Sequence, residues 1–235
     1  MQLASVSKPT IVMAGALAGL LSTGLWLRAQ QAPDASAKPK EAPARAGELP
    51  PRAAPTDYPS QGKAGMITIA ADFMGHGVPT AEAGPYSTED FVVVETGIFG
   101  PAGSKLQLSP QDFSLRVNGK KQPLASESYL SVFKSLKDPE WEPPPSATKS
   151  KTTVGGGGGE TSQDDLPPII HMPMDLRHAM EQRVIKASFP EGDRALPQAG
   201  LLFFEYHGAV KGIRSAELIY SGPAGKAAIP LHVQY

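Results

Sequence analysis

Alternating apolar and polar residues in several short segments indicate a mainly β protein, an antiparallel sandwich with one short helix. The period of two in these segments is the side-chain period of a β-strand. Glycine, proline and asparagine separate about seven such segments at near-regular spacing, which is typical of a sandwich. A single segment among them has the spacing of an amphipathic helix instead.

Three strands are expected in the first half of the domain, and a short return strand after them. In residues 67–73 apolar side chains occupy alternate positions, as in a half-buried strand. Residues 91–99 form a longer apolar run with a single charged residue, so we expect this strand to be central. Residues 113–117 alternate and lead into Asn118–Gly119, the strongest short hairpin signal. The short return strand should then follow at Leu124.

One amphipathic helix is expected in the second half of the domain. Its apolar positions are Leu176, Met180, Val184 and Ala187. These residues share one face of a helix, while charged residues occupy the rest of its surface. The helix should begin near Pro173 and end by Phe189, because the residue before a proline is pushed out of the α region.

Three further strands are expected at the C-terminal end of the chain, in residues 201–206, 217–220 and 227–233. In the last of them apolar residues should face the core while Pro230 points outward. Proline cannot donate a hydrogen bond to a neighbouring strand. The last strand should therefore lie at an edge of its sheet.

The N-terminal residues 1–29 have the pattern of a signal peptide or a membrane anchor. Nineteen residues between Lys8 and Arg28 carry no charge, and residues 11–27 are apolar. A helix of that apolar length measures roughly 25 Å, close to the roughly 30 Å of a bilayer's hydrocarbon core. We therefore expect an exported protein, either in the periplasm or anchored in the inner membrane and facing the periplasm. Cleavage and retention of the segment both stay open.

Two tracts of biased composition divide the rest of the chain. Residues 30–64 are rich in alanine and proline and are expected to form a disordered linker. Residues 143–168 contain several prolines and five consecutive glycines and are expected to form a disordered insertion. The β-sandwich domain is therefore assigned to residues 65–235, with the insertion inside it.

The composition excludes several kinds of site. The chain has no cysteine, which excludes disulfides, thiol nucleophiles, cysteine-ligated metals and a lipidated cysteine. The formal net charge is -1, the two signs are evenly mixed and no basic stripe with interleaved aromatics occurs, so nothing in the sequence argues for nucleic acid or an anionic surface as a partner. Nucleic acid is not expected as a partner. No nucleophile motif or pair of carboxylates is found, and Glu205 is interpreted as an outward-facing strand residue. We therefore expect no enzymatic activity.

Three strand patterns resemble an immunoglobulin-like domain of unknown function that occurs in bacterial surface proteins and lipoproteins, the DUF4352-like family; they lie at 91–99, 106–119 and 200–206, ahead of Leu218–Tyr220. The resemblance covers residues 66–124 and 200–233. It implies an immunoglobulin-like β-sandwich in an uncharacterised exported bacterial protein, and it carries no catalytic residues. This chain differs from the family pattern in its insertion, its helix and its lack of a lipidated cysteine.

One cluster of residues has metal-ligand chemistry: His171, Met172, Met174, His178 and Met180. Imidazole and thioether groups together suit copper, the one cofactor that the sequence suggests. Met74 and His76 would add to the cluster if the fold brought them near. The same pattern also fits the start of an ordinary helix in which Met180 is a core residue, because methionine commonly fills gaps in cores.

These observations favour a non-enzymatic binding or structural module of the bacterial envelope with an unknown ligand. The partner is expected to be a protein or another envelope component, with a membrane contact through residues 11–27 if that segment is not cleaved. A periplasmic copper-handling protein is the second hypothesis. A hydrolase is a distant third.

Overall fold

The computed structural model describes residues 48–82, 84–141 and 172–233. All of them belong to the second of two compact units into which the chain divides, Glu41–Tyr235, while the first comprises Met1–Lys40. The predicted signal or anchor segment, 1–29, and the predicted insertion, 143–168, lie outside the described residues. No helix in the described part of the chain has the length and apolar character needed to cross a membrane.

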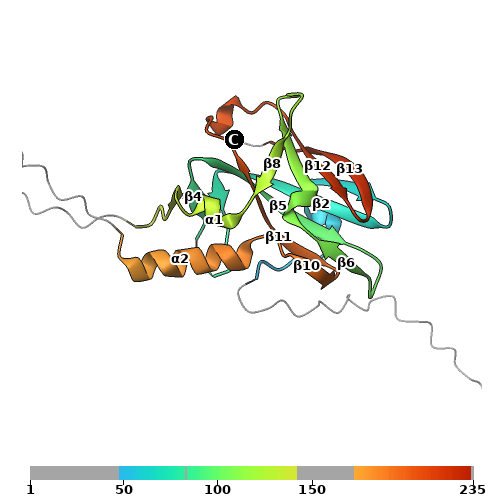
Figure 1. The fold of residues 1–235 in the computed structure, drawn as a ribbon, viewed down its shortest axis with the longest axis horizontal. Coiled ribbons are helices and arrows are strands. Elements are labelled where there is room, and N and C mark those ends of the chain that lie inside the picture. Colours follow the sequence, from blue (N-terminus) through green and yellow to red (C-terminus); the bar gives the residue numbers. More distant parts are fainter. Residues whose placement is uncertain (1–47, 83, 142–171, 234–235) are drawn as a thin grey trace, which may run out of the picture. The chain divides into compact units, whose positions relative to one another are not determined.

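Within the described residues the main sheet contains eight strands in the order β1–β2–β5–β11–β8–β7–β12–β13 (Figure 1). The strands span Ser60–Ala64 (β1), Ile67–Gly75 (β2), Phe91–Phe99 (β5), Phe113–Val117 (β7), Leu124–Glu127 (β8), Gln198–Glu205 (β11), Ala216–Gly222 (β12) and Gly225–Leu231 (β13). Every pairing between these strands is antiparallel. The mainly β, antiparallel class predicted from the sequence is confirmed.

Smaller elements flank the main sheet. A three-stranded sheet contains β3 (Gly77–Val78), β4 (Tyr86–Thr88) and β9 (Leu136–Lys137), and a two-stranded sheet contains β6 (Lys105–Leu108) and β10 (Gly192–Ala195). The α-helices are α1 (Tyr129–Val132) and α2 (Met174–Ala187), and the 3₁₀-helices are η1 (Pro55–Asp57), η2 (Pro110–Asp112) and η3 (Val210–Gly212).

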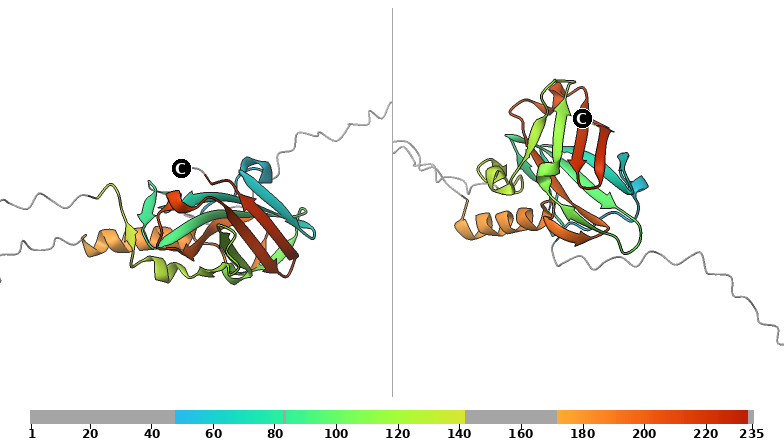
Figure 2. Two further views of the ribbon diagram at one scale, coloured as in Figure 1. Left: turned by 90° about the horizontal axis from the view of Figure 1, so that it is seen from above. Right: turned by 45° about the vertical axis from the view of Figure 1, so that its right-hand side comes forward.

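The two edges of the main sheet approach one another, so that the sheet is nearly closed like a barrel (Figure 2). The backbone N–H of His232 donates to the Ser60 hydroxyl at 3.0 Å. A β-carbon on Gly62 of β1 would lie 2.7 Å from Cγ1 of Ile229 in β13, so a glycine is needed at this close approach. An immunoglobulin-like sandwich has two separate sheets instead, and this finer prediction is not confirmed.

Two apolar clusters lie on the two sides of the sheet. The inner cluster fills the space that the sheet encloses and takes residues from β2, β5, β7, β11, β12 and β13. The outer cluster lies between β5, β11 and α2, and α1 and the three-stranded sheet add residues to it (Figure 1). The buried side chains of α2 are Met180, Val184 and Ala187. As a result, β5 and β11 are covered on both faces.

Burial on both faces explains why β5 and β11 are continuous apolar runs. Val92 and Leu202 belong to the inner cluster, whereas Val93 and Phe203 belong to the outer one. Strands covered on both faces carry apolar side chains at most positions, and alternation is lost; Glu95 in β5 is the charged exception and pairs with an arginine. The prediction that residues 91–99 form a central strand is confirmed, because β5 lies between β2 and β11.

The predicted hairpin, helix and edge strand are also confirmed. Asn118 and Gly119 have φ values of 52° and 66°, in the left-handed region that a tight turn requires, and they lead from β7 into the short β8. The helix α2 ends at Ala187, two residues before Phe189. β13 is an edge strand in the hydrogen-bonding order, and its Pro230 is exposed.

The predicted linker is too long at its C-terminal end. Its composition assigned residues 30–64 to disorder, yet the folded unit includes residues 48–64. Tyr58 is 4% exposed, and β1 pairs with β2 along its whole length. The proline content of this tract resembles that of residues 30–47, and β1 itself carries few apolar residues, so composition did not distinguish it. The domain therefore begins before residue 65.

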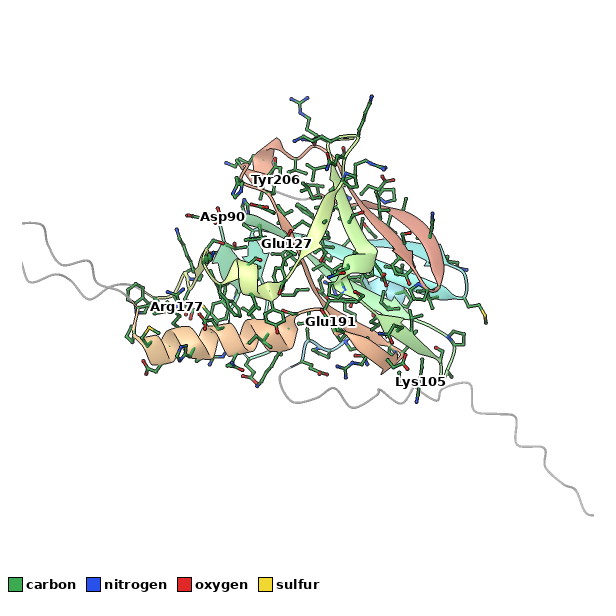
Figure 3. The ribbon with its side chains drawn as sticks, in the orientation of Figure 1. Asp90, Lys105, Glu127, Arg177, Glu191 and Tyr206 are labelled. Atoms are coloured by element: carbon green, nitrogen blue, oxygen red, sulfur yellow. The ribbon has the colours of Figure 1, made fainter. Side chains whose placement is uncertain are left out.

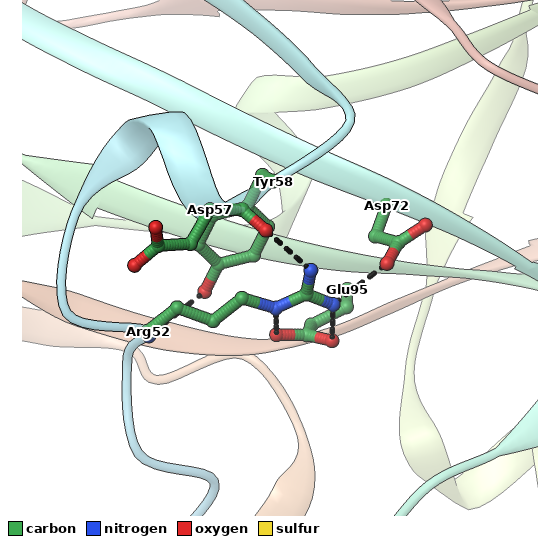
Figure 4. Close-up of polar contacts among 5 residues, drawn as sticks. All are labelled: Arg52, Asp57, Tyr58, Asp72 and Glu95. Atoms are coloured by element: carbon green, nitrogen blue, oxygen red, sulfur yellow. Dashed lines mark hydrogen bonds and ion pairs between the residues drawn. The ribbon is translucent and has the colours of Figure 1, made fainter.

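Arg52 holds the start of this tract against the sheet (Figure 4). Its Nε and Nη2 atoms lie 3.2 Å and 2.7 Å from the two carboxylate oxygens of Glu95, and Nη2 lies 2.6 Å from Oδ2 of Asp72. Nη1 donates to the Asp57 carbonyl at 2.8 Å, and the guanidinium lies 4.3 Å from the centre of the Tyr58 ring. Asp72 and Glu95 face each other across β2 and β5, so Arg52 pairs with both carboxylates and offsets the repulsion between them.

The buried phenol of Tyr58 should make the domain sensitive to alkali. Burial raises the pKa of Tyr58 to about 12, whereas the unfolded chain has the ordinary value of about 10. The unfolded chain therefore loses this proton first, and stability present below about pH 10 is lost as the pH rises towards about 12. Between neutral and alkaline pH, the free energy of unfolding should decrease by about 2 kcal/mol less in Tyr58→Phe than in the native chain. Urea unfolding at the two pH values measures this difference. An equal alkaline loss in both proteins would contradict this expectation.

Candidate functional site

A hollow of about 260 Å³ opens where β5 begins and β11 ends. Its lining residues are Asp90, Phe91, Glu127, Ser131, Lys134, Glu205 and His207. Phe91 pairs with Glu205 in the β5–β11 register, and the backbone N–H of Tyr206 donates to the Asp90 carbonyl at 2.7 Å. These backbone contacts hold the segments that carry the carboxylates side by side, and Figure 3 labels Asp90, Glu127 and Tyr206 in this region.

His207 joins two of the carboxylates. Its Nδ1 lies 3.2 Å from Oδ1 of Asp90, and its Nε2 lies 3.0 Å from Oε1 of Glu205. Asp90 directly precedes β5 and Glu205 ends β11, so the imidazole fastens the segment after β11 to the turn before β5. Both ring nitrogens donate hydrogen bonds when the imidazole is protonated.

The charge of His207 depends on these contacts. The hydrogen bonds to Asp90 and then Glu205 raise the pKa of His207 above its ordinary value. The two ion pairs are therefore complete below the ordinary pKa of about 6.5 and are lost as the pH rises through the raised pKa. Loss of this proton leaves the hollow with one positive charge fewer.

The hollow is better suited to binding a cation than to catalysis. Three carboxylates are opposed by one lysine, and by His207 when it is protonated. His207 is not placed as a general base for Ser131, because carboxylates occupy both of its ring nitrogens. The hollow's volume of about 260 Å³ lies just below the roughly 300–1,000 Å³ of common small-molecule pockets, so a single amino-acid side chain fits inside it.

Metal ligands do not gather in the described ranges. Within 48–82, 84–141 and 172–233, no group of three or more His, Cys, Asp or Glu side chains is arranged to hold a metal ion. This finding covers the hollow. It does not bear on methionine ligands, which the predicted copper cluster requires.

The structure separates the residues of the predicted copper cluster. Met174 and His178 are exposed and lie one turn apart on α2, whereas Met180 is 4% exposed and packs in the outer cluster. Met172 is partly buried against the same cluster, and His171 lies outside the described residues. The positions of Met172 and Met180 fit methionines that fill gaps in a core. The copper site stays a prediction.

The two other residues considered for copper lie near the outer cluster as well. Met74 packs against this cluster, as Met172 does, and Met180 belongs to it. His76 Nδ1 lies 2.7 Å from the Phe91 carbonyl oxygen, which fixes the orientation of that ring.

Sequence reasoning missed the hollow because its residues come from three separate segments, 90–91, 127–134 and 205–207. The sequence predicted that Glu205 faces outward, which the structure confirms. It did not predict that Glu205 contacts His207. One signal was present: residues two apart on an extended chain share a face, so Glu205 and His207 could be expected to meet. Asp90 and Glu127 gave no comparable signal, since only the strand order brings them near.

Comparison with known proteins identifies no match: no protein family, curated protein or solved structure matches the chain. The resemblance to the DUF4352-like family therefore stays a prediction.

Proposed function

We propose that this protein is a non-enzymatic binding module of the bacterial envelope whose hollow binds a lysine or arginine side chain of a protein partner. The observation that carries the proposal is that Asp90, Glu127 and Glu205 all line one hollow of about 260 Å³. Export with anchoring through residues 11–27 belongs to the proposal and is supported by the apolar N-terminal pattern. An immunoglobulin-like domain of the DUF4352-like type also belongs to it, supported by the antiparallel pairing alone.

The chemistry of the lining explains the choice of ligand. Hydrogen bonds between a carboxylate and an ammonium or guanidinium group contribute about 1.5–3 kcal/mol each. Phe91 also lines the hollow and offers apolar surface to the aliphatic stem of such a side chain. Lys134 adds one positive charge to the lining, which disfavours a ligand with several adjacent cations.

The carboxylates should be required individually for binding. We expect Glu127→Gln and Glu205→Gln each to weaken the binding of a capped single-lysine peptide to the full chain about tenfold, because each removes a charge-assisted hydrogen bond. Isothermal titration calorimetry or NMR titration measures the affinities. The matched control is Glu191→Gln, which removes an exposed carboxylate outside the hollow (Figure 3). An equal loss in the control would show attraction to overall charge and would overturn the proposal.

Binding should also depend on pH in a defined direction. The ligand's cation and protonated His207 compete for Asp90 and Glu205, so affinity should increase as the pH rises through the raised pKa of His207. His207→Asn should abolish this dependence while both carboxylates remain. Affinity that stays constant with pH in the native chain would contradict the competition.

Copper handling is the second candidate, because Met74, Met172 and Met180 border one apolar cluster and thioethers suit Cu(I). Titration of the full chain with Cu(I), with and without Met74→Leu and Met172→Leu, separates the two functions. Weak binding that both changes leave unaltered removes the copper candidate.

A further inference from the structure

Two loops leave the main sheet together where β7 ends and β12 begins. Val117 pairs with Ala216 in the β7–β12 register. The β7–β8 turn, residues 118–123, therefore begins beside the point where the segment that contains η3, residues 206–215, ends. Figure 1 shows both at the top of the view.

Asn118 joins the two loops. Its Oδ1 accepts hydrogen bonds from the backbone N–H groups of Arg214 at 2.7 Å and Ser215 at 3.2 Å, and its Nδ2 donates to the Gly212 carbonyl at 2.8 Å. The Asn118 backbone N–H also donates to the Ser215 carbonyl at 2.8 Å. Four hydrogen bonds from one residue hold the two loops in a single arrangement.

The joined loops carry four exposed basic residues, which we call the basic apex: Lys120, Lys121, Lys211 and Arg214. Among the described residues, no carboxylate forms an ion pair with any of the four. Arg116, closer to the sheet, differs because Glu217 neutralises it. Since the whole chain has a formal net charge of -1, the basic apex is a local concentration of positive charge.

A shallow hollow of about 530 Å³ lies within the basic apex, lined by Asn118, Gly212, Arg214 and Ser215. No aromatic side chain lines it, so it lacks the stacking surface that single-stranded nucleic acids require. Preorganised loops that carry basic side chains without ion-pair partners among the described residues suit phosphate groups.

We propose that the basic apex binds the anionic lipid headgroups of a membrane surface. The choice of lipid over other anions rests on the anchoring in our proposed function, because an anchor at residues 11–27 would keep the domain near a bilayer. Each basic residue close to an anionic bilayer strengthens binding about fivefold, and the attraction decreases within a Debye length. The four residues of the apex lie on two loops and can approach a surface together.

The test uses the full chain and its lack of cysteine. Gln122→Cys places a single fluorescent label in the β7–β8 turn, and lipids with spin-labelled headgroups quench the label on contact. Vesicles of zwitterionic lipid alone are compared with vesicles that contain anionic lipid. We expect strong quenching only with anionic lipid, and its loss at high salt.

A charge-matched pair of triple variants tests the assignment. The first triple variant carries Lys120→Glu, Lys121→Glu and Lys211→Glu. It should need about 100-fold more anionic lipid to reach half-maximal quenching. The second triple variant carries Lys63→Glu, Lys105→Glu and Lys226→Glu, which change the net charge equally at exposed positions outside the apex. This variant should retain most of the quenching by anionic lipid. Equal effects of the two triples, or equal quenching by both lipids, would overturn the proposal.

The failure of the anchor is distinguishable from the failure of the apex. If the chain does not associate with zwitterionic vesicles, the anchoring prediction is wrong, while quenching by anionic vesicles still reports on the apex. If inorganic phosphate binds the chain but anionic vesicles do not quench the label, the apex is a phosphate site and the lipid proposal is wrong.

Discussion

Replacing Arg52 with methionine is expected to lower the free energy of unfolding by about 3 kcal/mol. The change leaves Asp72 and Glu95, whose side chains are 22% and 10% exposed, opposed across β2 and β5 without their shared cation. Like charges at directly opposite positions in a sheet repel, and partly buried carboxylates retain little hydration. Urea unfolding at neutral pH measures the loss.

Arg116→Met is the matched control for this prediction. Arg116 pairs with a single carboxylate, that of Glu217, and the two side chains are more exposed, at 38% and 30%. Exposed pairs contribute about 0–1 kcal/mol, so the control should lose much less stability. Similar losses in the two variants would mean that Arg52 contributes no more than a surface ion pair.

The second large effect is expected from Gly200→Ala, which should also destabilise the fold by about 3 kcal/mol. A β-carbon at this position of β11 would lie 2.5 Å from Cα of Phe189 and 2.8 Å from the Ser188 carbonyl oxygen. Both are backbone atoms, so no side-chain rotation relieves the contact. The segment after α2 is hydrogen-bonded here, the Phe189 N–H donating to the Leu201 carbonyl at 2.9 Å, and it would have to move away from β11.

Gly212→Ala is the control for the glycine prediction. The nearest atom to its added β-carbon is Oη of Tyr206 at 3.8 Å, an ordinary contact distance. We expect a change within about 0.5 kcal/mol, measured by the same urea titration. If Gly200→Ala is as well tolerated as this control, the packing of the segment after α2 against β11 is wrong.

Local patterns predicted the strands well, because each depends on neighbouring residues. The alternation in residues 113–117 and the turn at Asn118–Gly119 fix a hairpin without reference to the rest of the chain. The strand order could not be predicted in this way. The approach of β1 to β13 depends on Gly62, a small residue whose importance appears only when Ile229 is placed opposite it.

The sites were harder to predict than the fold. Arg52 lies in a proline-rich tract that resembles a linker, and its partners, Asp72 and Glu95, appear on the outer face of two apolar strands. The acidic residues of the hollow are likewise distant in sequence and come together only through the β5–β11 and β8–β11 pairings. Charged residues have no period that identifies their partners, which explains why sequence patterns located the core but not these contacts.

The competition between a bound cation and His207 provides the most direct test of the proposed site. Because linkage is reciprocal, a ligand that binds Asp90 and Glu205 must lower the pKa of His207. The imidazole can be titrated by NMR in the full chain, with and without a saturating capped-lysine peptide. We expect a raised pKa in the free chain and a clearly lower pKa with the peptide. A pKa of His207 that the peptide leaves unchanged would contradict cation binding in the hollow.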